Sequence, residues 1–352
     1  MVDPDTGSRT FSMGEYLLAR YRRTRPTLGF RARNEDEWRE WRARFSRKLV
    51  ELLGEWPRRC PLRPQVIERV PDDGFTREKV IFESEPGMGV VAYVLIPHGL
   101  KRGTKAPGLL CAHGHGNGKD DVVGIHHGEH TRINTIRGLN YDYARQFAKR
   151  GYVVIAPDWR GFGERRLGYD FPGRDGCNVV FIKALMLGLN PLTLNVWDAQ
   201  RCLDYLQSRP EVDGKRLGCV GLSYGGTVTL FTAALDERVR AAVISCYLNA
   251  YGSYGLTLGN FCGSQTVPGL LKYGEMADVA ALIAPRPLLV EMGRRDDGFP
   301  IEDSRRAYRR VERAYRVLGA QERIACDEFD GGHAFSGRVA FEWMARWLEV
   351  AA

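Results

Sequence analysis

The chain has 352 residues, of which 44% are hydrophobic and 11% aromatic, and its formal net charge is +8. This composition excludes a disordered chain, and the length fits one large α/β domain or two medium ones. The eight cysteines are spread along the chain without a Cys-x-x-Cys pair, which excludes a disulfide scaffold and favours reduced thiols.

Neither a membrane nor a nucleic acid is expected as a partner. The N-terminus lacks a basic segment followed by an apolar one, and no apolar run is long enough to span a bilayer, so we expect a cytoplasmic protein. The densest run of arginines, residues 305–316, falls on a predicted helix that also carries acidic side chains. Such mixed charge is typical of a solvated helix face rather than a nucleic-acid surface.

Residues 1–64 predict a helical N-terminal extension. Asn34 and Glu37 fit a capping box at the start of one helix, and Pro57 ends it. Apolar side chains at spacings of three and four form one stripe of this helix, namely Trp38, Trp41, Phe45, Leu49, Leu52, Leu53 and Trp56. The stripe favours docking on a core, with a pocket wall or a dimer contact as the alternatives.

The rest of the chain alternates between strand and helix patterns. Apolar runs predict strands at residues 66–70, 79–83, 90–96, 108–113, 152–156, 216–222, 241–246, 287–292 and 323–329. Helical patterns lie at residues 141–150, 196–206, 225–235, 305–318 and 338–348. This order predicts one doubly wound, mostly parallel α/β domain over residues 65–352, with an antiparallel start. The irregular, Gly-rich stretch 247–274 is expected to form a lid or pocket loop.

The strongest chemical signal is Gly-Leu-Ser-Tyr-Gly at residues 221–225, which matches the nucleophile elbow G-x-S-x-G. It follows a predicted strand and precedes a predicted helix, which is the context that the motif requires. A serine there is exposed on a sharp turn, and the helix N-terminus stabilises negative charge beside it. We therefore expect Ser223 to be a nucleophile.

A serine hydroxyl needs a base that is held by an acid. His333 follows the predicted strand 323–329, and Asp296 and Asp297 follow the strand 287–292. The chain order Ser, Asp, His is that of an α/β-hydrolase and not that of chymotrypsin or subtilisin. One of the two aspartates could instead cap the helix that begins near Ile301.

A glycine-rich loop at residues 111–118 follows the first parallel strand and could stabilise an oxyanion. The expected donors are the backbone N–H of Tyr224 and one from Gly114, His115 or Gly116. A zinc site built on His113 and His115 lacks a clear third ligand in the sequence, although further histidines lie at positions 126, 127 and 130. We expect neither a bound metal nor another cofactor.

A segment rich in charged residues, 158–166, follows the predicted parallel strand 152–156. Asp158 is expected to hold the loops by hydrogen bonds. Glu164, Arg165 and Arg166 either line the substrate pocket or form a structural ion-pair cluster. Arg160, Arg165 and Arg294 could select an acidic or sugar-acid ester.

Taken together, these motifs resemble the α/β-hydrolase superfamily and, within it, the dienelactone-hydrolase-like and acetyl-xylan-esterase-like branch. The resemblance spans roughly residues 76–350 and is carried by His-Gly-His-Gly at 113–116, Asp-x-Arg-Gly-x-Gly at 158–163, the elbow at 221–226, Ala-Pro-Arg-Pro at 284–287, Gly-Arg-Arg-Asp at 293–296 and Gly-Gly-His at 331–333. It implies the α/β-hydrolase fold and a catalytic triad of Ser223, Asp296 and His333.

Departures from related families narrow the expectation. Dienelactone hydrolases use a cysteine where this chain has Ser223, and glucuronoyl esterases place an arginine where it has Tyr224. We therefore expect a serine hydrolase of carboxylic esters, with short-acyl and sugar acetyl esters as substrates. A peptidase or amidase with the same triad, and a non-catalytic binding protein on this scaffold, are the alternatives. The oligomeric state stays open.

Overall fold

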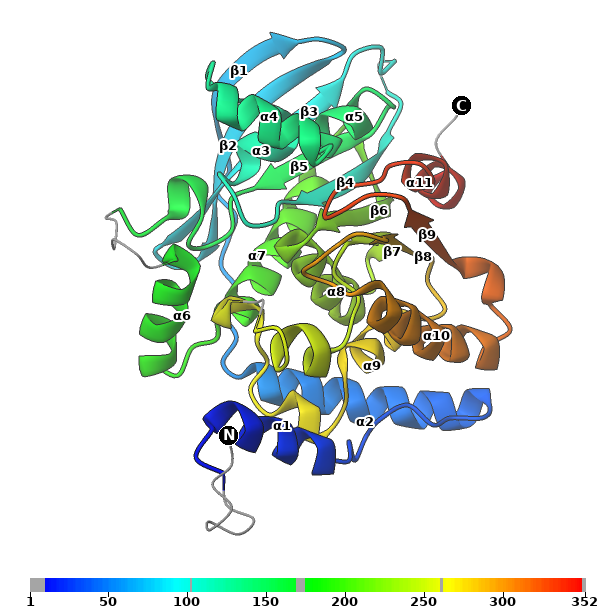
Figure 1. The fold of residues 1–352 in the computed structure, drawn as a ribbon. Coiled ribbons are helices and arrows are strands. Elements are labelled where there is room, and N and C mark those ends of the chain that lie inside the picture. The colour runs from blue at the N-terminus through cyan, green and yellow to red at the C-terminus, as the bar shows by residue number, and fades with distance from the viewer. Residues whose placement is uncertain (1–9, 102, 169–174, 260–261, 350–352) are drawn as a thin grey trace.

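The computed structural model describes residues 10–101, 103–168, 175–259 and 262–349 (Figure 1). Within them, nine strands form one sheet in the order β1-β2-β3-β5-β4-β6-β7-β8-β9. The strands are β1 (Gln65–Asp72), β2 (Phe75–Glu85), β3 (Met88–Pro97), β4 (Ala106–Ala112), β5 (Val153–Pro157), β6 (Val212–Leu222), β7 (Val239–Ser245), β8 (Leu288–Gly293) and β9 (Ile324–Phe329). All nine coincide with predicted strands.

The sheet is antiparallel at one end and parallel over the rest. Strands β1 to β3 form a meander, and β3 pairs antiparallel with β5. From β5 to β9 every neighbouring pair is parallel. The chain passes from β4 to β5 on one side and later enters β6 on the other, so the topological switch point lies at β4. Ligands of open α/β sheets bind beside the carboxyl ends of the strands at such a point.

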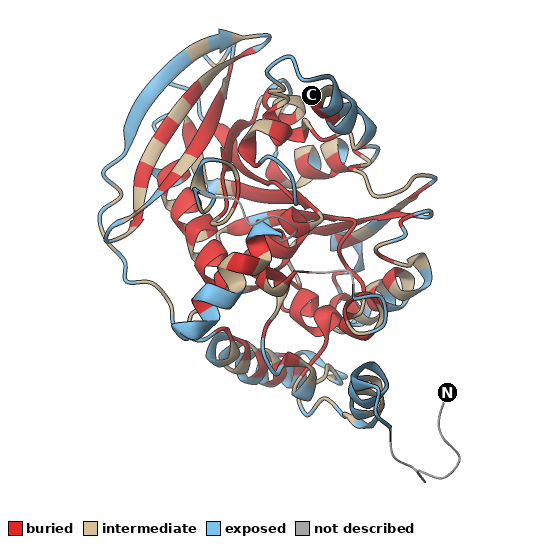
Figure 2. Ribbon diagram, turned by 60° about the vertical axis from the view of Figure 1, so that its left-hand side comes forward, coloured by how far each residue is buried: buried red, intermediate tan, exposed pale blue. Residues whose placement is uncertain are grey.

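Helices cover both faces of the sheet, which explains why β4, β5 and β8 are buried along their whole length (Figure 2). One face carries α7 (Pro191–Ser208), α8 (Tyr224–Leu235), α9 (Met276–Ala281) and α10 (Ile301–Val317). The other carries α3 (Lys119–Val123), α4 (His130–Gly138), α5 (Tyr143–Ala148) and α11 (Ala340–Leu348). The predicted doubly wound fold is therefore confirmed.

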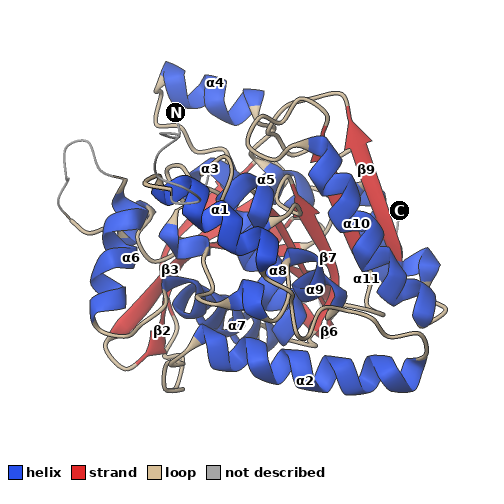
Figure 3. Ribbon diagram, turned by 60° about the horizontal axis from the view of Figure 1, so that its bottom comes forward, coloured by secondary structure: helices blue, strands red, loops and turns tan. Residues whose placement is uncertain are grey.

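The N-terminal region contributes α1 (Met13–Arg23) and α2 (Glu35–Leu53), and α2 runs along one side of the molecule (Figure 3). The side chain of Asn34 caps α2 by accepting a hydrogen bond from Glu37 N–H at 2.9 Å. The apolar stripe is buried at Trp38, Trp41, Phe45, Leu49 and Leu53 and joins the core of the α8 face. Core docking is thus the correct one of the three interpretations of this stripe.

Two segments beside the sheet have little regular structure. The first lies between β5 and α7 and contains α6 (Gly176–Met186), a helix that the sequence patterns did not indicate. The second, the expected lid or pocket loop, contains the short turns η3 (Tyr251–Gly255), η4 (Gly263–Gln265) and η5 (Leu270–Lys272). No single helix among the described residues is long and apolar enough to cross a membrane, and α6 and α7, which would qualify only as a pair, are bent by 102°.

Candidate active site

Ser223 stands on the turn between β6 and α8, with a backbone φ of 60° and ψ of −122°. A positive φ is strained for a residue with a side chain, and such strain clusters at functional sites. The turn is also crowded, since a Cβ on Gly221 would lie 2.2 Å from the carbonyl oxygen of Gly225, and one on Gly225 would lie 1.8 Å from that of Ala112. Only glycine at these positions lets β6, α8 and β4 meet.

Asp296 and His333 form a hydrogen-bonded pair at the ends of β8 and β9. Nδ1 of His333 donates to Oδ2 of Asp296 at 2.8 Å. The other carboxylate oxygen accepts the N–H groups of Gly298 at 3.0 Å and Phe299 at 3.2 Å. Asp296 is buried, whereas Asp297 is exposed. The geometry therefore selects Asp296 as the partner of the imidazole.

The two loops that carry this pair pack tightly on each other. A Cβ on Gly293 would lie 2.2 Å from the carbonyl oxygen of Gly332, so the acid-bearing loop contacts the His333 loop directly. The ring of Phe299 stacks on His333, with centroids 5.6 Å apart and planes at 12°. Glu291 accepts the N–H of Gly337 at 2.9 Å, and burial raises the pKa of this carboxyl group to about 7.

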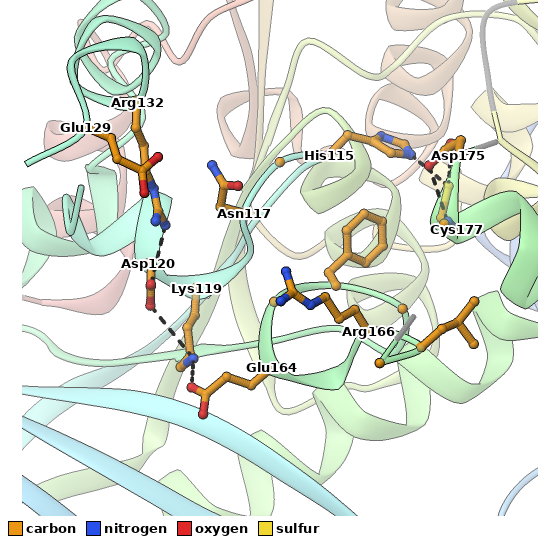
Figure 4. Close-up of a pocket in the computed structure, with 17 residues that line it drawn as sticks. His115, Asn117, Lys119, Asp120, Glu129, Arg132, Glu164, Arg166, Asp175 and Cys177 are labelled. Carbon is orange, nitrogen blue, oxygen red and sulfur yellow. Dashed lines mark hydrogen bonds and ion pairs between the residues drawn. The ribbon is translucent and has the colours of Figure 1, made fainter. Parts of the chain in front are cut away.

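Ser223, Asp296 and His333 all line one cavity of about 770 Å³. The loop of residues 247–274 contributes Gly259, Cys262 and Gln265 to its wall. A second cavity of about 990 Å³ shares His115 and Asp175 with the first, so the two adjoin as one cleft. This second part is lined by charged side chains, which include Lys119, Glu129, Arg132, Glu164 and Arg166 (Figure 4).

Comparison with known proteins places this arrangement in a family. The model described as Abhydrolase family matches residues 7–330. The chain belongs to this family. The Bacillus subtilis (strain 168) protein named "Putative hydrolase YtaP" is 26% identical over 326 residues, which are 87% of this chain and all of that protein.

Two further matches connect this abhydrolase to the branch that its motifs resemble. The Saccharomyces cerevisiae protein named "Putative carboxymethylenebutenolidase" is 36% identical over 115 residues, which are 32% of this chain and 40% of that protein. A crystal structure described as a "putative acetyl xylan esterase" from Bacteroides fragilis NCTC 9343 superposes with a TM-score of 0.77 at 22% identity and covers 93% of this chain and 84% of that one. The likeness of these folds confirms the α/β-hydrolase fold.

The glycine-rich loop after β4 lies against the nucleophile turn, since a Cβ on Gly114 would be 3.0 Å from that of Ser223. The N–H of Gly114, however, donates to the hydroxyl of Tyr141 at 2.6 Å. This bond contradicts the expectation that Gly114 is an oxyanion donor, because its N–H is already engaged within the loop. His115 and Gly116 stay predictions, and the N–H of Tyr224 lies in the first turn of α8, where helices leave donors free.

The histidines of this loop have different environments. His113 is fully buried, with Nδ1 2.7 Å from the carbonyl oxygen of Gly114 and Nε2 accepting the N–H of Trp159 at 3.1 Å. His115 instead meets two thiols that the sequence did not place near it. Its Nε2 lies 3.3 Å from Sγ of Cys262 and 3.4 Å from Sγ of Cys177. Hydrogen bonds with Cys177 and His115 lower the pKa of the Cys262 thiol.

Asp158 holds the loops of the abhydrolase together, as expected. Its carboxylate accepts the backbone N–H groups of Lys119 at 2.7 Å and Glu164 at 3.0 Å. Nζ of Lys119, almost fully buried, lies 2.9 Å from Oδ2 of Asp158 and also pairs with Glu164. Burial favours a lower pKa for Lys119, but these carboxylates outweigh it, so the pKa is raised.

Replacing Lys119 with methionine should lower the free energy of unfolding by about 3–5 kcal/mol, because it leaves the Asp158 carboxylate buried without its cation. Urea denaturation measures this loss. The double variant Lys119→Met/Asp158→Asn is the matched control, since it removes both charges and should recover part of the stability. An unchanged midpoint for Lys119→Met would contradict the role of this ion pair.

The expectation that Arg160 and Arg165 line the substrate pocket is wrong. Arg160 forms ion pairs with Asp198 at 2.9 Å and Glu85 at 2.6 Å, and Arg165 pairs with the same Asp198 at 2.7 Å. Asp198 is fully buried, so it needs these cations. The structural alternative is therefore correct for Arg165, and Arg160, for which only a substrate role is expected from the sequence, belongs to the same ion-pair cluster. Glu164 does line the cleft, although its carboxylate is paired with lysines.

Proposed function

We propose that this abhydrolase is a serine hydrolase of carboxylic esters in which Ser223, His333 and Asp296 form the catalytic triad. The observation that carries the proposal is the hydrogen-bonded pair of His333 and Asp296 on the same cavity as a strained Ser223. Because Nδ1 of His333 is bonded to the carboxylate, Nε2 is the ring nitrogen that is left to accept a proton. This is the division of roles in serine hydrolases.

The reaction follows from these positions. Ser223 Oγ attacks the ester carbonyl carbon while His333 Nε2 takes its proton, and the Asp296 carboxylate stabilises the imidazolium. The N–H groups of Tyr224 and His115 donate to the oxyanion. The imidazolium then protonates the leaving alcohol, which leaves an acyl group on Ser223. Water, deprotonated by the same imidazole, releases the acid and restores the serine.

The cleft supports an ester with a short acyl group and a polar alcohol, such as an acetylated sugar. The charged part of the cleft offers donors and acceptors to hydroxyl groups, with Arg166 and Glu129 among its lining residues. The aromatic ring of Phe299 and the loop residues Gly259 and Cys262 line the part next to Ser223. The likeness to an acetyl xylan esterase agrees with this substrate class.

Hydrolysis of p-nitrophenyl acetate, butyrate and octanoate tests the proposal, together with acetate release from an acetylated xylo-oligosaccharide. We expect kcat/KM to fall from acetate to octanoate, by roughly tenfold or more, and the acetylated sugar to be cleaved. Faster cleavage of an aminoacyl-anilide than of a matched ester would indicate a peptidase. A folded protein that turns over none of these compounds would contradict the ester hydrolase.

A further inference from the structure

We propose that His115, Cys177 and Cys262 bind a Zn²⁺ ion in the wall of the cleft. Their ligand atoms, one imidazole nitrogen and two thiol sulfurs, all lie within 4.8 Å of one another. The nitrogen is 3.3 Å and 3.4 Å from the two sulfurs. None of the steps proposed for ester hydrolysis uses either thiol, so this site is additional to the triad.

The spacing is close to that of a tetrahedral zinc site. With Zn–S bonds of about 2.3 Å and Zn–N bonds of about 2.0 Å, tetrahedral angles place sulfur about 3.8 Å from sulfur and about 3.5 Å from nitrogen. The observed nitrogen–sulfur distances are 0.1–0.2 Å shorter than this, as 3.3 Å and 3.4 Å show. Small outward movements of the side chains would therefore admit the ion.

Asp175 lies beside this cluster and contacts one of its three ligands. Its Oδ2 lies 2.9 Å from Sγ of Cys177, and Oδ1 accepts the N–H of the same cysteine at 3.3 Å. His115, Cys177 and Asp175 face one another in the close-up of the cleft (Figure 4). A set of two thiolates and one imidazole suits Zn²⁺, whereas Mg²⁺ and Ca²⁺ prefer oxygen ligands alone.

The ligands come from three segments, and hydrogen bonds join the two that carry the cysteines. His115 lies on the loop after β4, Cys177 in the first turn of α6, and Cys262 directly before η4. Ser264 Oγ donates to the carbonyl oxygen of Cys177 at 3.0 Å, and Gly263 N–H donates to Asn178 Oδ1 at 2.8 Å. These bonds hold both thiols in place, so little ordering is needed when the ion binds.

The remaining cysteines of the described residues do not offer such a site, and neither Cys60 nor Cys326 belongs to a cluster of metal-binding side chains. Cys111, Cys202 and Cys219 are fully buried in the apolar core. Cys246 lies near Asp296 and His333, but that imidazole and carboxylate are already engaged with each other. The ion would connect the loop after β4, which is expected to donate to the oxyanion, with the two irregular segments beside the sheet.

The test is a Zn²⁺ titration of the full chain, after treatment with a chelator and kept under reductant, against a chromophoric chelator. We expect one Zn²⁺ per chain, and with Co²⁺ the thiolate-to-metal and visible bands of a tetrahedral site. We expect a loss of Zn²⁺ affinity of roughly 100-fold or more in each of the variants Cys177→Ser, Cys262→Ser and His115→Asn. Even the loss of a residue that only hydrogen-bonds to a metal ligand typically lowers metal affinity by about 10–100-fold. Cys326→Ser, at an exposed thiol, is the matched control and should bind as the wild type does.

The wild-type Co²⁺ spectrum keeps the test valid even where a variant fails to fold. The proposal is overturned if the reduced wild-type chain binds no Zn²⁺, or if the three ligand variants bind it as tightly as Cys326→Ser does. A Cys177–Cys262 disulfide together with no Zn²⁺ uptake after its reduction would also overturn it. Ser223→Ala separates this proposal from that of the triad, because this variant should lose hydrolysis and still bind one Zn²⁺.

Discussion

Ser223→Ala should lower kcat for p-nitrophenyl acetate by roughly a million-fold, to the level that binding and oxyanion stabilisation alone provide. The reason is that the proposed acyl intermediate forms on Oγ of Ser223, which alanine lacks. The variant should fold, because alanine keeps the Cβ and the backbone N–H that donates to the carbonyl oxygen of Ser245 at 3.1 Å. Steady-state kinetics, with circular dichroism as the check of folding, measure the effect.

Ser208→Ala provides the matched control. This serine ends α7, and its hydroxyl donates to the carbonyl oxygen of Tyr205 at 2.7 Å. We expect it to keep wild-type kinetics and to react with a fluorophosphonate, whereas Ser223→Ala should not react. Full esterase activity in Ser223→Ala would show that another group is the nucleophile.

Most of the fold could be predicted because its central strands are apolar runs that lie between turn residues. Buried parallel strands such as β4 and β5 stand out as continuous apolar runs, and α7, α8 and α10 follow them in the expected order. The sequence patterns missed α3, α4, α6 and α9. A five-residue helix such as α3 contains too few turns for a periodic pattern, and α6 is apolar on most sides, with Met186 exposed.

The candidate site could be predicted only where its residues follow strands. Ser223, Asp296 and His333 stand directly after β6, β8 and β9, and parallel strands bring their carboxyl ends to one edge. The contact of His115 with Cys177 and Cys262 spans 62 and 147 residues along the chain. Neither cysteine follows a strand, so no local pattern indicates this cluster. Arg160 is another such case. Its ion pair with the buried Asp198 joins residues that are 38 positions apart, so the sequence alone does not indicate this partner.

Asp296→Asn should lower kcat by roughly ten-thousand-fold, and Asp297→Asn should leave it close to the wild-type value. The contrast follows from the hydrogen bonds of the Asp296 carboxylate. Its Oδ1 accepts two backbone N–H groups, so the carbonyl oxygen of an asparagine would stay there and its NH₂ group would face Nδ1 of His333. Nδ1 would then have to accept a hydrogen bond, and the proton would move to Nε2.

An imidazole in that tautomer cannot take a proton from Ser223, although the cavity keeps its shape. The two variants make the same substitution at adjacent positions. They differ in that Asp296 is buried, whereas Asp297 is exposed. The kcat values of both variants for p-nitrophenyl acetate, measured together with their thermal unfolding midpoints, separate catalysis from stability. Equal losses in the two variants would contradict the assignment of Asp296, and a loss confined to Asp297→Asn would transfer the acid's role to its neighbour.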